Sequence, residues 1–308
     1  MKRHLLTLYT RTPLHVGSGT SVDVVDLPIM RERITGFPVI PSTSLKGVLL
    51  QRGREVWNVP HATGNDLPEQ AKILFGGIDE TKNANGEKEQ KSNAGCVQIM
   101  EAKILAFPVR SLAGCFAWLT CPAVLERYQR DTGKKFDVPQ PGKDQAVVTG
   151  DCALTIPGQA QVILEEYALA TLPSEAIKAK GVADALKTAC ADPLWIESLG
   201  KRLAVLNDEN FQHFVTTCTE VVARIAINPA TRTNTGGALF NQENVPCEAV
   251  FYSVLSVFPP RRNGVAADFN ANTKLAELLP AQNPPILQIG GDETTGHGLC
   301  ETKREELP

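Results

Sequence analysis

The 308-residue sequence contains no long apolar run and no marked excess of charge of one sign. None of its apolar runs reaches the roughly 20 residues that a membrane-spanning helix needs, so we expect no membrane partner. Residues 1–19 are basic, but Arg11 and Pro13 soon interrupt their apolar run. This pattern predicts a strand rather than a signal peptide, and with it a cytoplasmic protein.

The sequence also lacks any pair of cysteines spaced C-x-x-C, although it contains eight cysteines. In a chain of this length without a secretion signal, free and mostly buried thiols are expected rather than disulfides. A zinc site built from Cys115, Cys121 and a distant histidine is the alternative that the spacing leaves open.

The usual nucleotide-binding signatures are incomplete or missing. Residues 290–298 (GGDETTGHG) space two glycines as a P-loop does, but they lack the Lys-Ser/Thr pair that reaches a terminal phosphate and its magnesium. Gly17-Ser18-Gly19 lacks the third glycine of the dinucleotide fingerprint. We therefore expect no nucleotide cofactor. Residues 290–298 are either a tight turn between strands or a flat surface for a nucleic-acid backbone.

Net charge is only −3, which argues against a protein coated in positive charge. The local distribution of charge is more informative about binding partners than the net charge, because residues 31–54 contain five basic residues and a single acidic one. Such a cluster forms either a solvated surface or a phosphate-binding face. The basic residues are Arg31, Arg33, Lys46, Arg52 and Arg54.

Residues 14–47 are the most informative stretch. A glycine turn at Gly17 is followed by Asp23 and Asp26, by basic residues, and by a Ser/Thr-rich helix start that carries Lys46. Glycine turns and helix starts offer backbone N–H groups to phosphates, and an aspartate beside them can hold a metal or act on a proton. The pattern predicts a protein that grips a nucleic-acid backbone and cuts it. A lone exposed carboxylate at Asp26 and a structural role for His15 are the alternatives.

The order of elements predicts an α+β fold with an antiparallel sheet. We expect strands at 3–10 and 96–109, and a helix at 42–57 with Ser42 as its N-cap. Residues 286–300 are expected to form a strand, a glycine loop and a second strand. We also expect a polar, mobile loop over about 78–95 and helices over about 174–225. Residues 231–258 contain two β-prone runs about Gly236-Gly237, which predicts a long hairpin followed by a core strand.

Four blocks of the sequence resemble one family when they are taken in order. They span residues 14–47, 106–128, 237–253 and 287–300, and they are similar to blocks of the RAMP-type backbone subunit of type III-B CRISPR effector (Cmr) complexes. The resemblance implies one ferredoxin-like (RRM-like) domain over residues 1–308. Its parts are a palm, a helical lid insertion at about 174–225 and a thumb β-hairpin at about 228–252.

The resemblance also implies an endoribonuclease that is active only within its complex. Copies of such a subunit stack along a guide RNA (crRNA) with other subunits of the complex, and complementary single-stranded target RNA is cut at regular intervals beside each thumb. Two alternatives stay open. One is a non-catalytic scaffold that binds crRNA, and the other is a guide-processing endonuclease. The latter would need a His placed with Tyr or Lys, and the sequence shows no such cluster.

The family's catalytic aspartate falls on Asp26, which could bind Mg²⁺ or Mn²⁺ or orient the attacking 2′-hydroxyl; His15 and Asp23 are candidates of second rank. Leu239 and Phe240 are the candidates for the apolar thumb wedge. The candidates for RNA backbone binding are Gly17, Ser18, Gly19, Arg31, Ser42, Ser44, Lys46, Gly47, Arg52, Gly290, Gly291, Gly296, His297 and Gly298.

Overall fold

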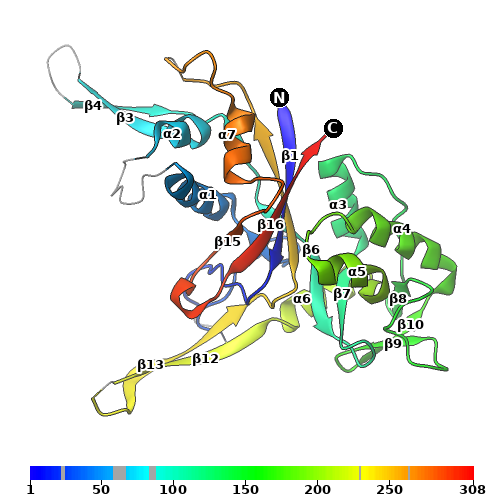
Figure 1. Cartoon of the computed structure of the whole chain (residues 1–308). Helices are drawn as coiled ribbons and strands as arrows, with labels where there is room; N and C mark the ends of the chain where they lie inside the picture. Colours follow the sequence, from blue (N-terminus) through cyan, green and yellow to red (C-terminus); the bar gives the residue numbers. More distant parts are fainter. Residues whose placement is uncertain (22–24, 58–66, 83–87, 229, 263) are drawn as a thin grey trace.

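The computed structural model of the chain describes residues 1–21, 25–57, 67–82, 88–228, 230–262 and 264–308 (Figure 1). A 12-stranded, mostly antiparallel sheet runs through it. At its centre β1 (Lys2–Thr10) pairs antiparallel with β14 (Val250–Val257) and β16 (Leu299–Leu307). Residues 4–10 of β1 are buried on both faces, as expected of a central strand covered on both sides. The predicted α+β fold with an antiparallel sheet is therefore confirmed.

The sheet extends from this centre in both directions. One side ends with β15 (Ile286–Gln288), and the other continues through β6 (Ala102–Arg110) and β7 (Phe116–Thr120). The only parallel neighbours among the described strands are β7–β11 and β8–β10. The remaining strands of the sheet are β2 (Val39–Ile40), β5 (Val97–Ile99), β8 (Gln145–Val148), β9 (Gln161–Leu164), β10 (Tyr167–Thr171) and β11 (Leu203–Val205).

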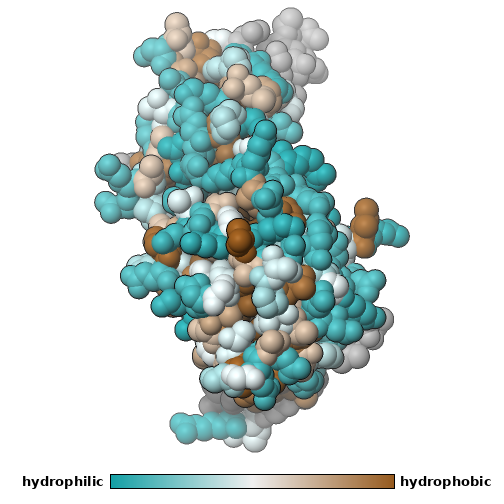
Figure 2. All heavy atoms as spheres, turned by 90° about the vertical axis from the view of Figure 1, so that its right-hand side faces the viewer, coloured by the Kyte–Doolittle hydropathy of each residue, from teal (hydrophilic) through white to brown (hydrophobic). Residues whose placement is uncertain are grey.

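Helices lie on both sides of the central strands. In Figure 1, α1 (Ser42–Val56), α2 (Glu69–Phe75) and α7 (Ala271–Leu278) lie together to the left of β1, and the other helices lie to its right. The right-hand lobe presents a largely hydrophilic face with isolated apolar side chains (Figure 2). Its helices are α3 (Pro122–Thr132), α4 (Ala176–Leu186), α5 (Pro193–Arg202) and α6 (Asp208–Thr217), with a 3₁₀ turn at Pro173–Glu175.

Helix α1 follows its predicted range, because Leu45, Leu49 and Gly53 recur every four residues and are buried. The predicted Ser42 cap is wrong. Pro41 occupies the N-cap position, its carbonyl accepts the N–H of Ser44 at 3.0 Å, and no side chain caps the helix. The helix begins on a residue whose fixed φ is already compatible with a helix start, so a serine cap is not needed.

The prediction of a polar loop over 78–95 is also wrong. The described residues of this region form β3 (Gly77–Lys82) and β4 (Lys88–Asn93), which pair antiparallel from Gly77–Asn93 to Lys82–Lys88. Backbone N–H and C=O groups bond each other in such a ribbon whatever the side chains are, so low apolar content did not exclude it. Residues 83–87, where this expectation also fell, lie outside the described residues.

A long hairpin leaves the body at its lower edge, as Figure 1 shows. It consists of β12 (Glu220–Ile227) and β13 (Asn234–Asn244), so the strand material begins earlier than the sequence indicated. The turn is not at Gly236-Gly237, because both glycines lie inside β13. Asn228 makes the turn instead: its side-chain oxygen accepts the N–H of Ala230 at 2.9 Å, as in an Asx turn. The predicted helical region 174–225 accordingly contains β11 and most of β12 as well as α4–α6.

All eight cysteines are free, and Cys96, Cys121, Cys190 and Cys300 are buried, which confirms the expectation of free thiols. Across the described ranges, no group of three or more His, Cys, Asp or Glu side chains is placed to hold a metal ion, so the zinc alternative at Cys115 and Cys121 finds no support. In the same ranges no helix is both long and apolar enough to cross a bilayer.

Candidate nucleic-acid interface

The first and the last glycine turns of the chain meet at His15. The N–H of Gly291 donates to the His15 carbonyl at 2.9 Å, and the N–H of Gly298 donates to the carbonyl of Pro13 at 2.8 Å. A Cβ on Gly290 would stand 2.1 Å from the His15 oxygen, and one on Gly17 would stand 2.7 Å from His15 Nε2. Position 290 therefore requires glycine, because the obstacle there is backbone, whereas at Gly17 the obstacle is the end of the His15 side chain. The two turns form one continuous surface.

The terminal glycine loop is tightly wound between β15 and β16, around a short 3₁₀ turn at Glu293–Thr295. Gly290, Gly296 and Gly298 have φ values of +84°, +79° and +74°, and Asp292 is also left-handed at +63°. Gly291 and Gly296 are exposed, so bare backbone lies at the surface of the loop. This geometry suits a ligand that approaches the main chain closely.

The base of the β12–β13 hairpin is bonded to this loop. Asp292 Oδ2 lies 3.1 Å from Arg224 Nη2 of β12 and accepts a hydrogen bond from Gln242 Nε2 of β13 at 2.6 Å. His297 Nε2 lies 3.4 Å from the same guanidinium nitrogen, while its Nδ1 is 3.1 Å from Thr295 Oγ1. His297 is thereby turned toward the hairpin. Asp292 and Arg224 were not among the predicted residues.

Asp26 lies at the foot of the hairpin on the opposite edge of β13. Its side chain is exposed, and Oδ2 accepts the backbone N–H of Asn241 at 2.7 Å. The next residue, Leu27, pairs with β13 as well, because its N–H donates to Asn241 O and its carbonyl accepts the N–H of Glu243, both at 3.0 Å. The carboxylate is thus attached directly to the backbone of the hairpin. Asp23 lies outside the described residues.

Glu243 connects the elements beneath Asp26, and sequence reasoning missed it. Its side chain is buried; Oε1 lies 2.5 Å from Arg31 Nη2 and accepts a hydrogen bond from Thr219 at 2.8 Å, while Oε2 accepts the N–H of Ile29 at 3.0 Å. Arg31 also donates to two backbone carbonyls, including that of Gly36 at 2.9 Å. Its guanidinium therefore supports the loop from inside. The sequence contained one signal for Glu243, which is the run of polar residues 241–244 in an otherwise apolar part of the chain.

His15 is held by the same residue. Its Nδ1 lies 2.6 Å from the Glu243 carbonyl, which can only accept, so Nδ1 carries the proton in this bond. Nε2 is directed toward Gly17, and the side chain is 9% exposed. A buried, bonded histidine at this junction positions the glycine turns whether or not it also moves a proton.

The start of α1 is connected to the first glycine turn through the backbone. Val39 N–H donates to Met30 O at 3.1 Å, and Met30 N–H donates to Val16 O at 2.7 Å. Lys46 and Gly47 are exposed in the following turns of α1, and a Cβ on Gly47 would meet nothing within 4 Å. Ser42 and Ser44 are half-buried at the helix start. Farther along α1, Arg52 Nη1 lies 3.3 Å from Glu55 Oε2.

The two predicted wedge residues occupy opposite faces of the hairpin. Leu239 is 62% exposed and pairs with Ile225, which is 53% exposed. Phe240 is half-buried and pairs with Arg224, on the face that meets the glycine loop. Leu239 and Ile225 thus form an exposed apolar pair on a projecting element.

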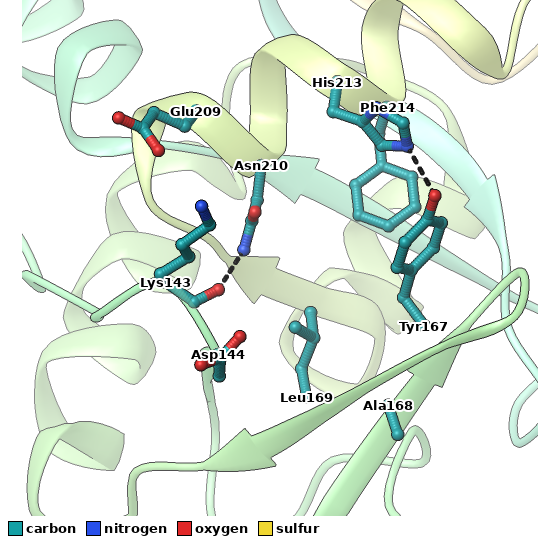
Figure 3. Close-up of a pocket in the computed structure, with 9 residues that line it drawn as sticks. All are labelled: Lys143, Asp144, Tyr167, Ala168, Leu169, Glu209, Asn210, His213 and Phe214. Atoms are coloured by element: carbon teal, nitrogen blue, oxygen red, sulfur yellow. Dashed lines mark hydrogen bonds between the residues drawn. The ribbon is translucent and has the colours of Figure 1, made fainter.

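A His-Tyr-Lys grouping exists after all, away from these elements. His213 Nε2 of α6 lies 3.1 Å from the hydroxyl of Tyr167 in β10, and Figure 3 shows the two side chains pointing toward each other. Lys143 lines the same pocket of about 400 Å³. Asp144 and Glu209 line it as well, and their charge opposes an RNA phosphate. The expectation that the chain offers no such cluster is wrong, but the cluster is unsuited to phosphate.

Comparison with known proteins gives consistent matches over the whole chain. Residues 7–301 match the RAMP superfamily. The chain is 36% identical over 311 residues to the CRISPR system Cmr endoribonuclease Cmr4 of Pyrococcus furiosus, covering 100% of this chain and 97% of that protein. The crystal structure of oligomeric Cmr4 from the same organism superposes with a TM-score of 0.73 at 32% identity, with 100% of both chains covered.

A more distant structure shares the fold. A chain of the type III-B Cmr-beta complex, determined by cryo-EM with cognate target RNA, has a TM-score of 0.68 at 18% identity and covers 98% of this chain and 96% of that chain. At this level of identity the match concerns the architecture.

Proposed function

This chain belongs to the RAMP superfamily, and from that membership we propose that it is the target-cleaving backbone subunit of a type III-B CRISPR ribonucleoprotein. It binds the crRNA backbone, associates with further copies of itself along the guide, and cuts complementary RNA at regular intervals. The observation that carries the proposal is the hydrogen bond from Asn241 N to Asp26 Oδ2, which fixes an exposed carboxylate at the foot of a projecting hairpin.

The grip on the RNA comes from the joined glycine turns and the start of α1. Gly17, Ser18 and Gly291 are exposed, so their backbone groups are accessible to phosphate and ribose oxygens. Lys46 adds a positive charge, and the open space over Gly47 lets a backbone approach the helix closely. Because Arg31 is paired with Glu243, its charge acts on the RNA less directly than that of Lys46.

The chemistry uses the nucleophile that RNA itself carries. In a regular A-form helix the 2′-oxygen is not in line with the bond between phosphorus and the 5′-oxygen. Flipping a nucleotide out of the duplex permits the alignment. The 2′-oxygen loses its proton and bonds to phosphorus, and the bond to the 5′-oxygen breaks. The 5′-oxygen takes a proton from water, so the products are a 2′,3′-cyclic phosphate and a 5′-hydroxyl. Asp26 orients the 2′-hydroxyl or accepts its proton.

We place a divalent cation beside Asp26. Magnesium prefers hard oxygen ligands and is commonly held by one or two carboxylates together with substrate phosphates. Asp26 is an exposed carboxylate at a surface where we place RNA phosphate, so it would supply one such ligand. Bound there, Mg²⁺ or Mn²⁺ would offset the negative charge that develops on the phosphate.

The partners follow from the same proposal. The relative from Pyrococcus furiosus crystallised as an oligomer, and the Cmr-beta complex holds target RNA. We place this chain in a comparable assembly, with crRNA, target RNA, further copies of itself and other subunits. Since guide and target are RNAs of the cell interior, the proposed location is the cytoplasm.

One observation favours a non-catalytic scaffold as the second candidate. The hydrogen bond between Asp26 and Asn241 is also what a purely structural carboxylate would make at a strand edge. A scaffold would use the same glycine turns and the same hairpin, and Asp26 would only attach the loop to β13.

The direct test is cleavage of an end-labelled target by the assembled complex with a defined crRNA. We expect fragments at a regular nucleotide interval, and the fragment on the 5′ side of each cut should end in a 2′,3′-cyclic phosphate that phosphatase alone does not remove. A complex that binds crRNA and target but leaves the target intact would favour the scaffold. Cuts confined to precursor crRNA would instead indicate guide processing.

The hairpin wedge predicts a second effect. Replacing Leu239 by alanine removes most of an exposed apolar side chain that we expect to replace base stacking beside the flipped nucleotide. Because an apolar wedge offsets an unstacking cost of about a few kcal/mol per base step, we expect cleavage to slow by about tenfold or more with crRNA binding unchanged. Single-turnover rates measure it. Leu112, which is 70% exposed between β6 and β7, provides the matched control. Equal rates for the two alanine variants would contradict a wedge at Leu239.

A further inference from the structure

A second cavity, of about 400 Å³, lies beside the root of the β12–β13 hairpin and outside the surface assigned to RNA. This volume falls within the range of about 300–1,000 Å³ that is usual for ligand sites. Apolar side chains make part of its wall, notably Pro108, Val109, Phe116 and Pro246. Glu248 and Glu220 also line it, so the cavity combines an apolar wall with carboxylates.

Glu248 is the unusual member of this set. Its Oε2 is buried and, within the described part of the chain, accepts no hydrogen bond. Its backbone is left-handed, with φ of +70°, and is held there by two bonds: its N–H donates to Thr10 O at 2.7 Å, and its carbonyl accepts Trp118 Nε1 at 2.8 Å. A strained backbone that holds a buried, unsatisfied carboxylate oxygen at a cavity indicates a function for that oxygen.

The electrostatics of the cavity point to a cation. Burial raises the pKa of the Glu248 carboxyl, and burial also raises the pKa of Glu220, against which His297 acts in the opposite direction. Arg110 and Glu165 also line the cavity, but their charges offset each other, because Arg110 Nη2 lies 2.8 Å from Glu165 Oε2. A positive group entering the cavity would compensate the desolvated carboxyls, whereas an RNA phosphate would be repelled by them.

We propose that this cavity receives an arginine or lysine side chain presented by a neighbouring protein subunit. The aliphatic stem of such a side chain would pack on Pro108, Val109 and Phe116, and its charged end would pair with the Glu248 carboxylate. The proposal rests on the proposed function only in assuming a multisubunit assembly. The cavity adjoins the hairpin root, so the neighbour would abut the element that we expect to enter the guide–target duplex.

The chemistry of the cavity can be tested on the free chain with two small probes. N-acetylargininamide carries the cation, and N-acetylcitrullinamide has nearly the same shape without the charge. Titration is followed by carboxyl ¹³C NMR of glutamate-labelled protein. We expect saturable shifts with the arginine probe and binding at least about tenfold weaker with the citrulline probe, as for a charge-assisted hydrogen bond.

Two substitutions locate the effect. Glu248→Gln keeps the shape of the side chain and should weaken the arginine probe by about tenfold, whereas Glu197→Gln, at an exposed position of α5, should leave its affinity unchanged. Equal affinity of the two probes, or an unchanged affinity of the Glu248→Gln variant, would overturn the cation site. Neither result depends on nuclease activity, so failure here is distinguishable from failure of the proposed function.

The identity of the occupant is tested in the native assembly. Cys247 lines the cavity, so its alkylation by iodoacetamide, read by mass spectrometry, reports whether the cavity is covered. We expect alkylation to slow by about tenfold or more in the assembled complex relative to the free chain, with Cys152 as the reference thiol. Protection by crRNA alone would show an RNA contact, and no protection in the complex would show an open cavity; either result would overturn a protein neighbour.

Discussion

Replacing Asp26 by alanine is expected to slow target cleavage by about 10²-fold or more, as is usual when a group that moves a proton in the transition state is removed. Binding of crRNA should be unchanged, because the residues proposed to grip the guide lie on the glycine turns and α1. The side chain is exposed but accepts the N–H of Asn241, so its loss should lower the free energy of unfolding by about 0.5–1.5 kcal/mol. Single-turnover cleavage by the assembled complex measures the effect.

Asparagine at position 26 separates the effect of the carboxylate charge from the effect of the hydrogen bond to Asn241. Asp26→Asn retains an oxygen that can accept the N–H of Asn241, so the loop should stay bonded to β13. If the carboxylate charge acts on the RNA, this variant should be as slow as alanine. If cleavage proceeds at the normal rate in both variants, Asp26 is not catalytic, and the scaffold becomes the better account.

Alanine at Gly290 should destabilise the chain by about 2–4 kcal/mol, combining a left-handed backbone with overpacking. The residue has φ of +84°, and the added Cβ would stand 2.1 Å from the carbonyl oxygen of His15. The obstacle is backbone rather than a flexible side chain, so the two glycine turns must move apart. Equilibrium unfolding in urea gives the free-energy difference, and crRNA affinity should fall with it.

Gly296 in the same loop is the matched control. Its φ is +79°, but a Cβ there would meet nothing within 4 Å. Gly296→Ala should therefore show only the conformational cost, about 1 kcal/mol. Equal destabilisation of the two variants would mean that the contact between Gly290 and His15 contributes nothing.

Elements whose signals are local could be predicted from the sequence. The apolar spacing of Leu45 and Leu49 predicted α1, in which both side chains are buried. The glycine loop between β15 and β16 also followed from its residues. The β3–β4 ribbon could not be predicted in this way, because its strands consist largely of polar residues whose pairing is set by the backbone.

The candidate site could be predicted only in part, for a similar reason. Its glycines and Asp26 stand out in the sequence, but their arrangement depends on partners more than 200 residues away, as for Asn241 and Asp26. Arg31 was predicted to be a phosphate ligand because its ion-pair partner, Glu243, lies 212 positions away and is not apparent in the local sequence. No local pattern reveals such a pairing, and so the basic cluster of residues 31–54 overstated the charge that is free to meet RNA.

The hydrogen bond between Asn241 N and Asp26 Oδ2 joins the proposed catalytic carboxylate directly to the main chain of the hairpin. The position of the carboxylate on the target is therefore set by the position of the hairpin. On this account, the interval between cuts equals the distance from one subunit to the next along the RNA. Changing the nucleotide sequence of the target would not change that interval. Lengthening β13 between the tip of the hairpin and Asn241 would shift every cleavage site by the same amount.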